Sequence, residues 1–97
     1  MDNPLIGRWI TDSEDRNAIA IYGRVTLEFS DDGKLIYTIH EDDKDQIIFL
    51  TYQIRDNFLI TDQPSKPQQE ITKFELTDAG KLSLFFDGEE SRYIKDM

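Results

Sequence analysis

Cysteine is absent from the sequence, and histidine occurs only once, as His40. Without cysteine the chain has no disulfide framework, no thiolate zinc site and no cysteine nucleophile. Any Ser-His-Asp arrangement would have to include His40. The absence of cysteine fits a cytoplasmic protein, and we expect that location.

Positive charge is scarce as well, because 11 Lys and Arg residues oppose 20 Asp and Glu residues and give a formal net charge of −9. This charge repels phosphate backbones and anionic lipid headgroups. No apolar stretch approaches the roughly 18 residues of a membrane helix, and the first residues lack the basic segment and apolar run of an export signal. We therefore expect neither a nucleic-acid nor a membrane partner.

Glycine-rich segments are also missing, since the five glycines are scattered singly along the chain. A phosphate-binding loop of the glycine-rich kind is therefore not expected. What the sequence does contain is 97 residues, of which 38% are hydrophobic. That is enough apolar material for one core, and we expect residues 1–97 to form a single domain.

The apolar residues alternate with polar ones almost everywhere, which predicts strands and no helix. From Ile19 to Phe29 the odd positions are mostly apolar, so we expect one strand here, with a bulge or bend at Gly23. A first strand is expected over Leu5–Thr11, and a last one over Ser91–Ile94.

Three turns join the strands of the first half. The segment Ser30–Lys34 predicts a hairpin loop with Gly33 at positive φ, which sets Phe29 opposite Leu35. The acidic segment Asp42–Asp45 predicts the next turn, with Glu41 opposite Gln46 and hence Tyr37 opposite Leu50 and Ile39 opposite Ile48. The pair Asp56-Asn57 predicts a two-residue turn that sets Ile54 opposite Leu59. The segment Thr61–Gln69, which contains two of the three prolines, is then expected as the main exposed loop.

The second half repeats a hairpin of the first. Residues Val25–Leu35 match Thr72–Leu82, each position 47 residues further on. The repeat predicts that Phe74 and Leu76 pair with Leu84 and Leu82. Together the elements predict an all-β fold, an antiparallel up-and-down meander of about eight strands that closes into a small barrel. The alternative is an open, curled half-barrel whose edges pair with another copy of the chain.

The segment Gly7-Arg8-Trp9 on the first strand resembles the Gly-x-Trp motif of the lipocalin and fatty-acid-binding-protein superfamily. The run Leu27-Glu28-Phe29 followed by Asp32-Gly33-Lys34 is similar to short bacterial lipocalin-like domains. The resemblance implies a barrel in which Trp9 packs across one closed end. The chain differs from the larger relatives in its length, and we find neither a C-terminal helix nor a helical lid in its pattern.

Nearly all residues predicted to face inward are large, so we expect a small pocket or none. If a pocket is present, Trp9, Tyr37 and Tyr52 are expected to line it and to bind a small apolar or aromatic ligand.

Five apolar residues are predicted to face outward on neighbouring strands. They are Ile36, Ile47, Phe49, Phe58 and Ile60. A contiguous apolar patch usually marks an interface, which predicts a homodimer or a protein partner. The alternative is a patch covered by the Asp62–Gln69 loop or by the N-terminal segment.

His40 alternates with Ile39 and is expected on the outer face, without a nucleophile beside it. The acidic turn lacks the Asp-x-Asp-x-Asp-Gly pattern of a calcium loop and is expected to be solvated. We therefore expect no catalytic residue, no metal and no cofactor. The leading interpretation is a non-enzymatic binding or interaction module that self-associates. The second is a carrier of a small ligand, and a hydrolase-type enzyme is third.

Overall fold

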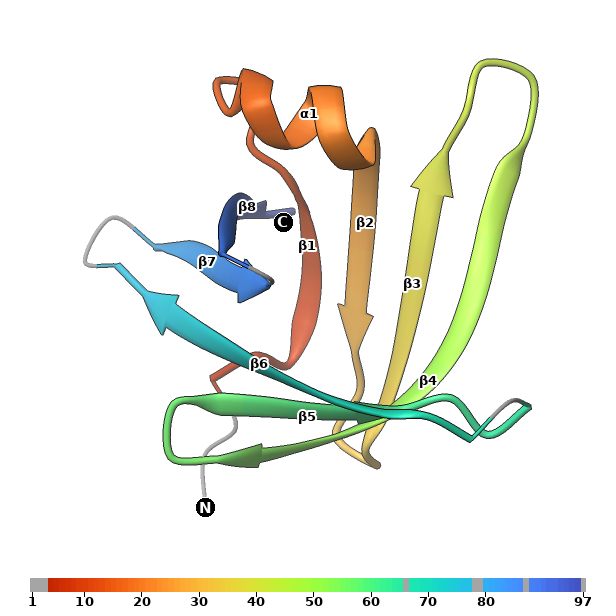
Figure 1. Ribbon diagram of the computed structural model, residues 1–97, viewed down its shortest axis with the longest axis vertical. Coiled ribbons are helices and arrows are strands. Elements are labelled where there is room, and N and C mark those ends of the chain that lie inside the picture. Colours follow the sequence, from red (N-terminus) through yellow and green to blue (C-terminus); the bar gives the residue numbers. More distant parts are fainter. Residues whose placement is uncertain (1–3, 66, 78–79, 87, 97) are drawn as a thin grey trace.

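The computed structural model describes residues 4–65, 67–77, 80–86 and 88–96, which form eight antiparallel strands and one short helix (Figure 1). The strands are β1 (Gly7–Thr11), β2 (Arg24–Phe29), β3 (Lys34–His40), β4 (Asp45–Arg55), β5 (Phe58–Asp62), β6 (Gln69–Leu76), β7 (Lys81–Phe86) and β8 (Glu89–Lys95). Each strand pairs with the next one in the chain, and β8 pairs with β1. The meander therefore closes into a barrel, as predicted, and the open half-barrel is wrong.

Closure depends on the pairing of the first and last strands. Trp9 lies opposite Lys95, and Ile10 lies opposite Ile94. Beyond the strand, the backbone N–H of Asp96 donates to the carbonyl of Arg8 at 2.8 Å. This pairing leaves neither terminal strand with a free edge to recruit another chain.

Most of the predicted hairpin registers are confirmed. Phe29 lies opposite Leu35 in the first hairpin. Ile54 lies opposite Leu59, across a turn in which Asp56 adopts a φ of 57°. The repeated hairpin is also present, since β6 and β7 set Phe74 opposite Leu84 as expected.

The register of the acidic turn is wrong by two residues. Tyr37 lies opposite Ile48 rather than Leu50, and Ile39 lies opposite Gln46 rather than Ile48. The loop consists of 41–44, closed by a hydrogen bond from the backbone N–H of Glu41 to the carbonyl of Lys44 at 2.9 Å. Because the shift is two residues, every side chain stays on its predicted face.

The strand expected over Ile19–Phe29 is confirmed only as β2 (Arg24–Phe29), because residues 16–22 form a helix, α1 (Arg16–Tyr22). The carboxylate of Asp15 accepts a hydrogen bond from the backbone N–H of Ala18 at 3.2 Å and caps the first turn. Gly23 ends the helix with a φ of 77°, and its N–H donates to the carbonyl of Ile19 at 2.9 Å. The two caps stabilise a helix of seven residues although its apolar residues alternate as in a strand. Because of this alternation, Ile21 does not face the core and is 51% exposed.

Helix α1 lies at the end of the barrel where β1 ends and β2 begins (Figure 1). The expectation that the chain contains no helix is therefore wrong, although α1 lies between β1 and β2 and is not a C-terminal helix. The carboxylate of Asp15 links the helix to β8 by accepting the backbone N–H of Arg92 at 2.9 Å. The described residues contain no helix with the length and apolar character needed to cross a membrane.

The opposite end of the barrel is closed by the N-terminal segment. Leu5 is fully buried, and its carbonyl accepts a hydrogen bond from Nε1 of Trp9 at 3.0 Å. Nζ of Lys95 lies 4.7 Å from the centre of the Trp9 ring, a cation–π distance. Gly7, which lies between Leu5 and Trp9 in the sequence, has a φ of 123°. A Cβ atom added to it would lie 2.5 Å from Nζ of Lys95. These contacts explain why glycine precedes the tryptophan by two positions.

Asp12 joins the helix end of the barrel to the strands. It is buried at the end of β1 and accepts hydrogen bonds from Nζ of Lys81 at 2.9 Å and from the backbone N–H of Glu14 at 3.0 Å. These two hydrogen bonds hold the pKa of Asp12 below its ordinary value, and the bond from Lys81 has the larger effect.

We expect Asp12→Asn to lower the free energy of unfolding by about 1 kcal/mol at neutral pH, because the charge that faces Lys81 is lost. A lowered pKa means that the carboxylate stabilises the fold above the unfolded-state pKa of about 4 and loses this effect as the pH falls through the folded-state pKa. The difference from wild type should therefore shrink below about pH 4. Urea unfolding at neutral and acidic pH measures it, and an equal deficit at both would contradict the assignment.

Candidate functional site

The barrel interior has a cavity of about 320 Å³ that is open to solvent. Its apolar lining residues come from β2, β3, β4, β5 and β7 and are Leu27, Phe29, Leu35, Ile48, Leu50, Leu59, Leu84 and Phe86. Its polar lining residues, which we call the polar wall, come from β5, β6, their connection and β8 and are Thr61, Gln63, Gln68, Glu70, Thr72 and Ser91. Three tyrosines, Tyr22, Tyr37 and Tyr93, complete the lining. The interior thus presents both apolar and polar groups. The expectation of a small pocket is confirmed, with a volume of about 320 Å³.

The polar wall leads from solvent into the barrel. Gln68 and Glu70 are exposed, whereas Thr72, two residues further along β6, is buried. Across the strand pair, Thr61 of β5 lies directly opposite Glu70. Gln63 and Gln68 are the first and last residues of the connection between β5 and β6, and both line the cavity. The polar wall therefore reaches the surface at this connection.

The tyrosines bring phenol groups to the cavity from three elements. Tyr22 ends α1, Tyr37 belongs to β3, and Tyr93 belongs to β8. Burial raises the pKa of Tyr37 and, more strongly, that of Tyr93, whose hydroxyl accepts a hydrogen bond from Ser91 Oγ at 3.2 Å. The phenols of Tyr37 and Tyr93 therefore stay neutral at physiological pH.

Of the three residues predicted to line a pocket, Tyr37 lines this cavity, whereas Trp9 and Tyr52 are not among its lining residues. Trp9 directs its indole N–H to the carbonyl of Leu5 at the closed end. The Tyr52 ring packs edge-on against Phe29 with ring centres 5.0 Å apart, and its hydroxyl donates to the carbonyl of Ser30. Both side chains have polar groups bonded to backbone carbonyls and belong to the core.

The polar wall was missed by reasoning from the sequence, although its signal was present. Thr61 and Gln63 continue the inward alternation that begins at Leu59, and Glu70 and Thr72 continue that of Phe74. The segment 61–69 was interpreted as a loop, whereas Thr61 and Asp62 belong to β5. The turn at Asp56-Asn57 also predicts Tyr52 opposite Thr61, which is confirmed and places Thr61 on the inward face, but the residues that follow it were not extended as a polar lining.

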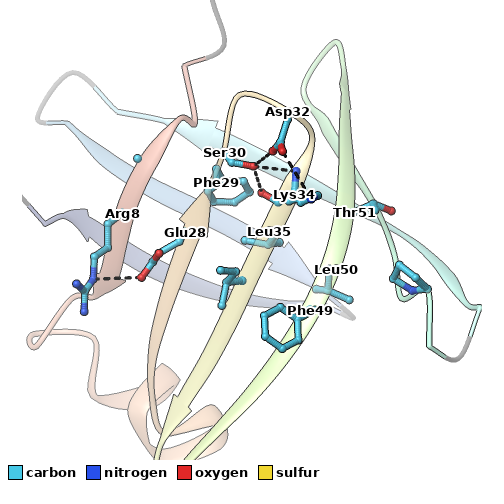
Figure 2. Close-up of a pocket in the computed structure, with 13 residues that line it drawn as sticks. Arg8, Glu28, Phe29, Ser30, Asp32, Lys34, Leu35, Phe49, Leu50 and Thr51 are labelled. Atoms are coloured by element: carbon cyan, nitrogen blue, oxygen red, sulfur yellow. Dashed lines mark hydrogen bonds and ion pairs between the residues drawn. The ribbon is translucent and has the colours of Figure 1, made fainter.

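A second hollow, of about 770 Å³, lies beside the turn between β2 and β3 (Figure 2). It takes side chains from both faces of the sheet, including Phe49. At one side Nε of Arg8 lies 3.9 Å from Oε1 of Glu28, and at the turn Nζ of Lys34 lies 3.7 Å from Oδ2 of Asp32. The hydrogen bond from Ser30 lowers the pKa of Asp32. All four charged groups are exposed, and each is paired with a group of opposite charge. The edge of this hollow is therefore solvated and carries no net charge from these two pairs.

The outer face of β3 to β6 carries apolar side chains where they were predicted. Ile47, Phe49 and Phe58 are 53%, 65% and 42% exposed, whereas Ile36 and Ile60 are half-buried. The neighbours expected from the predicted register, Thr38 beside Phe49 and Thr51 beside Ile36, are wrong. The two-residue shift places Phe49 directly opposite Ile36.

Ile71 of β6 extends this surface, since it lies opposite Ile60 and is 62% exposed. We call the six residues the outer apolar face: Ile36, Ile47, Phe49, Phe58, Ile60 and Ile71. Ile71 was missed because no register was predicted between β5 and β6. The described parts of the connection between β5 and β6 and of the N-terminal segment leave four of the six side chains exposed.

His40 lies on the outer surface, as predicted, but it has two side-chain partners. Its Nε2 lies 2.6 Å from Oγ1 of Thr26, and its Nδ1 lies 3.1 Å from Oδ1 of Asp45. This order of hydroxyl, imidazole and carboxylate is that of a Ser-His-Asp triad. However, Thr26 is only 3% exposed, so its hydroxyl is covered, and neither hollow includes these three residues. The contact links β2, β3 and β4.

Among the described residues, no group of three or more His, Asp or Glu side chains is placed to hold a metal ion. In comparisons with known proteins, no family model matches the sequence, and no curated protein matches it either. The structure itself is that of a closed, eight-stranded antiparallel barrel, which is consistent with a lipocalin-like barrel.

The chain has four tyrosines, and we expect Tyr37 and Tyr93 to ionise above the ordinary value of about 10. A raised phenol pKa stabilises the fold below the unfolded-state pKa, and this contribution is lost as the pH rises through the folded-state pKa. The free energy of unfolding should therefore decline above about pH 10. Phenolate absorbance during an alkaline titration measures this, with Tyr93→Phe as the control that removes one late step. Four phenols that titrate together in the folded protein would contradict it.

Proposed function

We propose that this chain is a lipocalin-like domain that binds a small ligand inside its barrel and does not act as an enzyme. The observation that carries the proposal is the cavity of about 320 Å³, whose lining combines apolar side chains with hydroxyl, amide and carboxylate groups. Ligand sites in proteins typically combine apolar walls with a few convergent polar groups. The Gly7-x-Trp9 contacts at the closed end support the likeness to lipocalins.

The volume limits the ligand to a small molecule. An apolar cavity of about 150 Å³ binds benzene, and pockets for drug-sized ligands begin at about 300 Å³. The large inward residues of β2 to β4, such as Leu27, Leu35 and Leu50, fill the space that a long acyl chain would need. A single aromatic ring or a short branched chain with one polar group is the ligand class that suits this interior.

The first test of the proposal is to fill the cavity from its wall. Thr61 is half-buried on β5 and lines the cavity, so Thr61→Phe should occupy part of the volume and remove hydrogen-bonding capacity. With phenylethanol as the probe, we expect amide NMR shifts around Tyr37 and Thr72 in the wild type. We expect the affinity of Thr61→Phe to fall by about tenfold or more, which corresponds to about 1.4 kcal/mol.

Thr51→Phe is the matched control, because Thr51 is exposed on the outer face of β4 and lines only the second hollow. It should bind phenylethanol as the wild type does. Circular dichroism and thermal unfolding establish that both variants are folded. If Thr61→Phe binds the probe unchanged, or if Thr51→Phe alone loses binding, the interior of the barrel is not the site.

A second function is favoured by the outer apolar face, namely self-association of the chain. The face has two groups, one on β3 and β4 and one on β5 and β6, with the outward residues Thr51, Gln53 and Arg55 of β4 between them. Four of its side chains, Ile47, Phe49, Phe58 and Ile71, are between 42% and 65% exposed, and exposed apolar groups on one sheet face favour burial against a partner. The surrounding outward positions carry both signs of charge, with Arg55 and Lys73 as well as Asp45, Asp62 and Glu75. A second copy suits this face, because the same mixture of apolar and oppositely charged groups on another chain would remove the apolar side chains from water and pair the charges.

Phe49 is the most exposed large apolar side chain of this face, so Phe49→Asp should separate the copies. We expect the wild type to elute at about twice its chain mass of 11.4 kDa at high concentration, and the variant at the chain mass itself. Ile21→Asp is the control, since Ile21 is also a large exposed apolar residue, at 51%, but lies on α1. Light scattering after size exclusion measures the mass, and a wild type that is monomeric at high concentration would rule out self-association.

A further inference from the structure

Charge is distributed unequally in the cavity lining. Glu70 is the one carboxylate among the described lining residues, and none of these residues is Lys, Arg or His. None of the ion pairs between described residues involves Glu70. The cavity therefore combines an apolar body, neutral hydrogen-bonding groups and a single negative charge that has no cationic partner among the described residues.

Resting on the proposed function, we propose that the cavity takes a small organic amine in its cationic form and discriminates against a carboxylate of the same shape. The carboxylate of Glu70 receives the ammonium group, and the apolar wall receives the aromatic or branched body of the ligand.

The depth of the groups sets the orientation of the amine. Glu70 is exposed, whereas Thr72 and Tyr93 are buried further inside. An ammonium group beside Glu70 keeps part of its hydration, so the ligand avoids most of the desolvation cost of burying a charge. Thr61 lies opposite Glu70 on the neighbouring strand, and its hydroxyl adds a second acceptor for the ammonium N–H groups.

The rest of the lining is compatible with a cation at the mouth and offers an anion only neutral hydrogen-bond donors and no positive charge. The rings of Tyr22, Tyr37, Tyr93 and Phe86 present aromatic surfaces, which attract cations through their faces. Because burial keeps the phenols of Tyr37 and Tyr93 protonated, they act as neutral hydrogen-bonding groups. A carboxylate ligand would instead meet the like charge of Glu70 and the net charge of −9 of the chain.

The test uses three probes with the same phenyl body and different head groups: phenylethylamine, phenylethanol and phenylpropionate. We expect the amine to bind about fivefold more tightly than the alcohol, the effect of one partly solvated ion pair. The carboxylate should bind most weakly. High salt should reduce the difference between the amine and the alcohol, because the pair is accessible to solvent.

Three variants separate the role of Glu70 from the general field of the protein. Glu70→Gln should remove the amine preference and leave phenylethanol binding unchanged. Glu75→Gln is the matched control, since Glu75 lies on the same strand with its side chain exposed at an outward position, and it should retain the preference. Glu70→Lys should reverse the preference toward phenylpropionate, a gain that loss of folding cannot produce.

The outcomes distinguish failure of the inference from failure of the proposed function. Equal affinity of the three probes, tighter binding of the carboxylate to the wild type, or an amine preference that survives in Glu70→Gln would overturn the inference while the cavity still binds ligands. If none of the probes binds at millimolar concentration, and Thr61→Phe behaves as the wild type, the proposed function fails and the inference fails with it.

Discussion

The pairing of β1 with β8 is the constraint on which the rest of this structure depends. A meander of eight strands has two free edges, and this pairing joins them with Trp9 opposite Lys95 and Ile10 opposite Ile94. Once the sheet is closed, alternation along each strand sends one set of side chains into an enclosed interior. The cavity, its amphipathic wall and the crowded core all follow from that closure, because an open sheet would expose the same residues to water.

The two ends of the barrel are closed by different chemistry. At one end Leu5 and Trp9 form an apolar floor, with a hydrogen bond from the indole to a backbone carbonyl. At the other end the contacts are ionic, since Asp12 bonds Lys81 and Asp15 both caps α1 and bonds the backbone of β8. The contact between Leu5 and Trp9 involves no titratable group, whereas the ionic end weakens when Asp12 is protonated. The two ends therefore differ in how they respond to acid.

Much of this fold was predictable from the alternation of residues and from turn chemistry. The hairpin at Ser30–Lys34 and the turn at Asp56-Asn57 have short loops with residues that tolerate positive φ, and such turns determine the register. Helix α1 was not predictable by alternation, because its stability comes from the cap at Asp15 and the glycine at its end rather than from a helical apolar period. The polar wall was missed for a related reason, since Thr61 was assigned to a loop that begins two residues later.

The repeated hairpin contributes to the interior twice, with different inward side chains in its two copies. Its copies lie in β2–β3 and β6–β7, four strands apart in a ring of eight, so the two ribbons occupy opposite parts of the ring. At matching inward positions Val25 corresponds to Thr72, and Tyr37 to Leu84. One repeated ribbon therefore supplies different side chains to two opposite parts of the same interior.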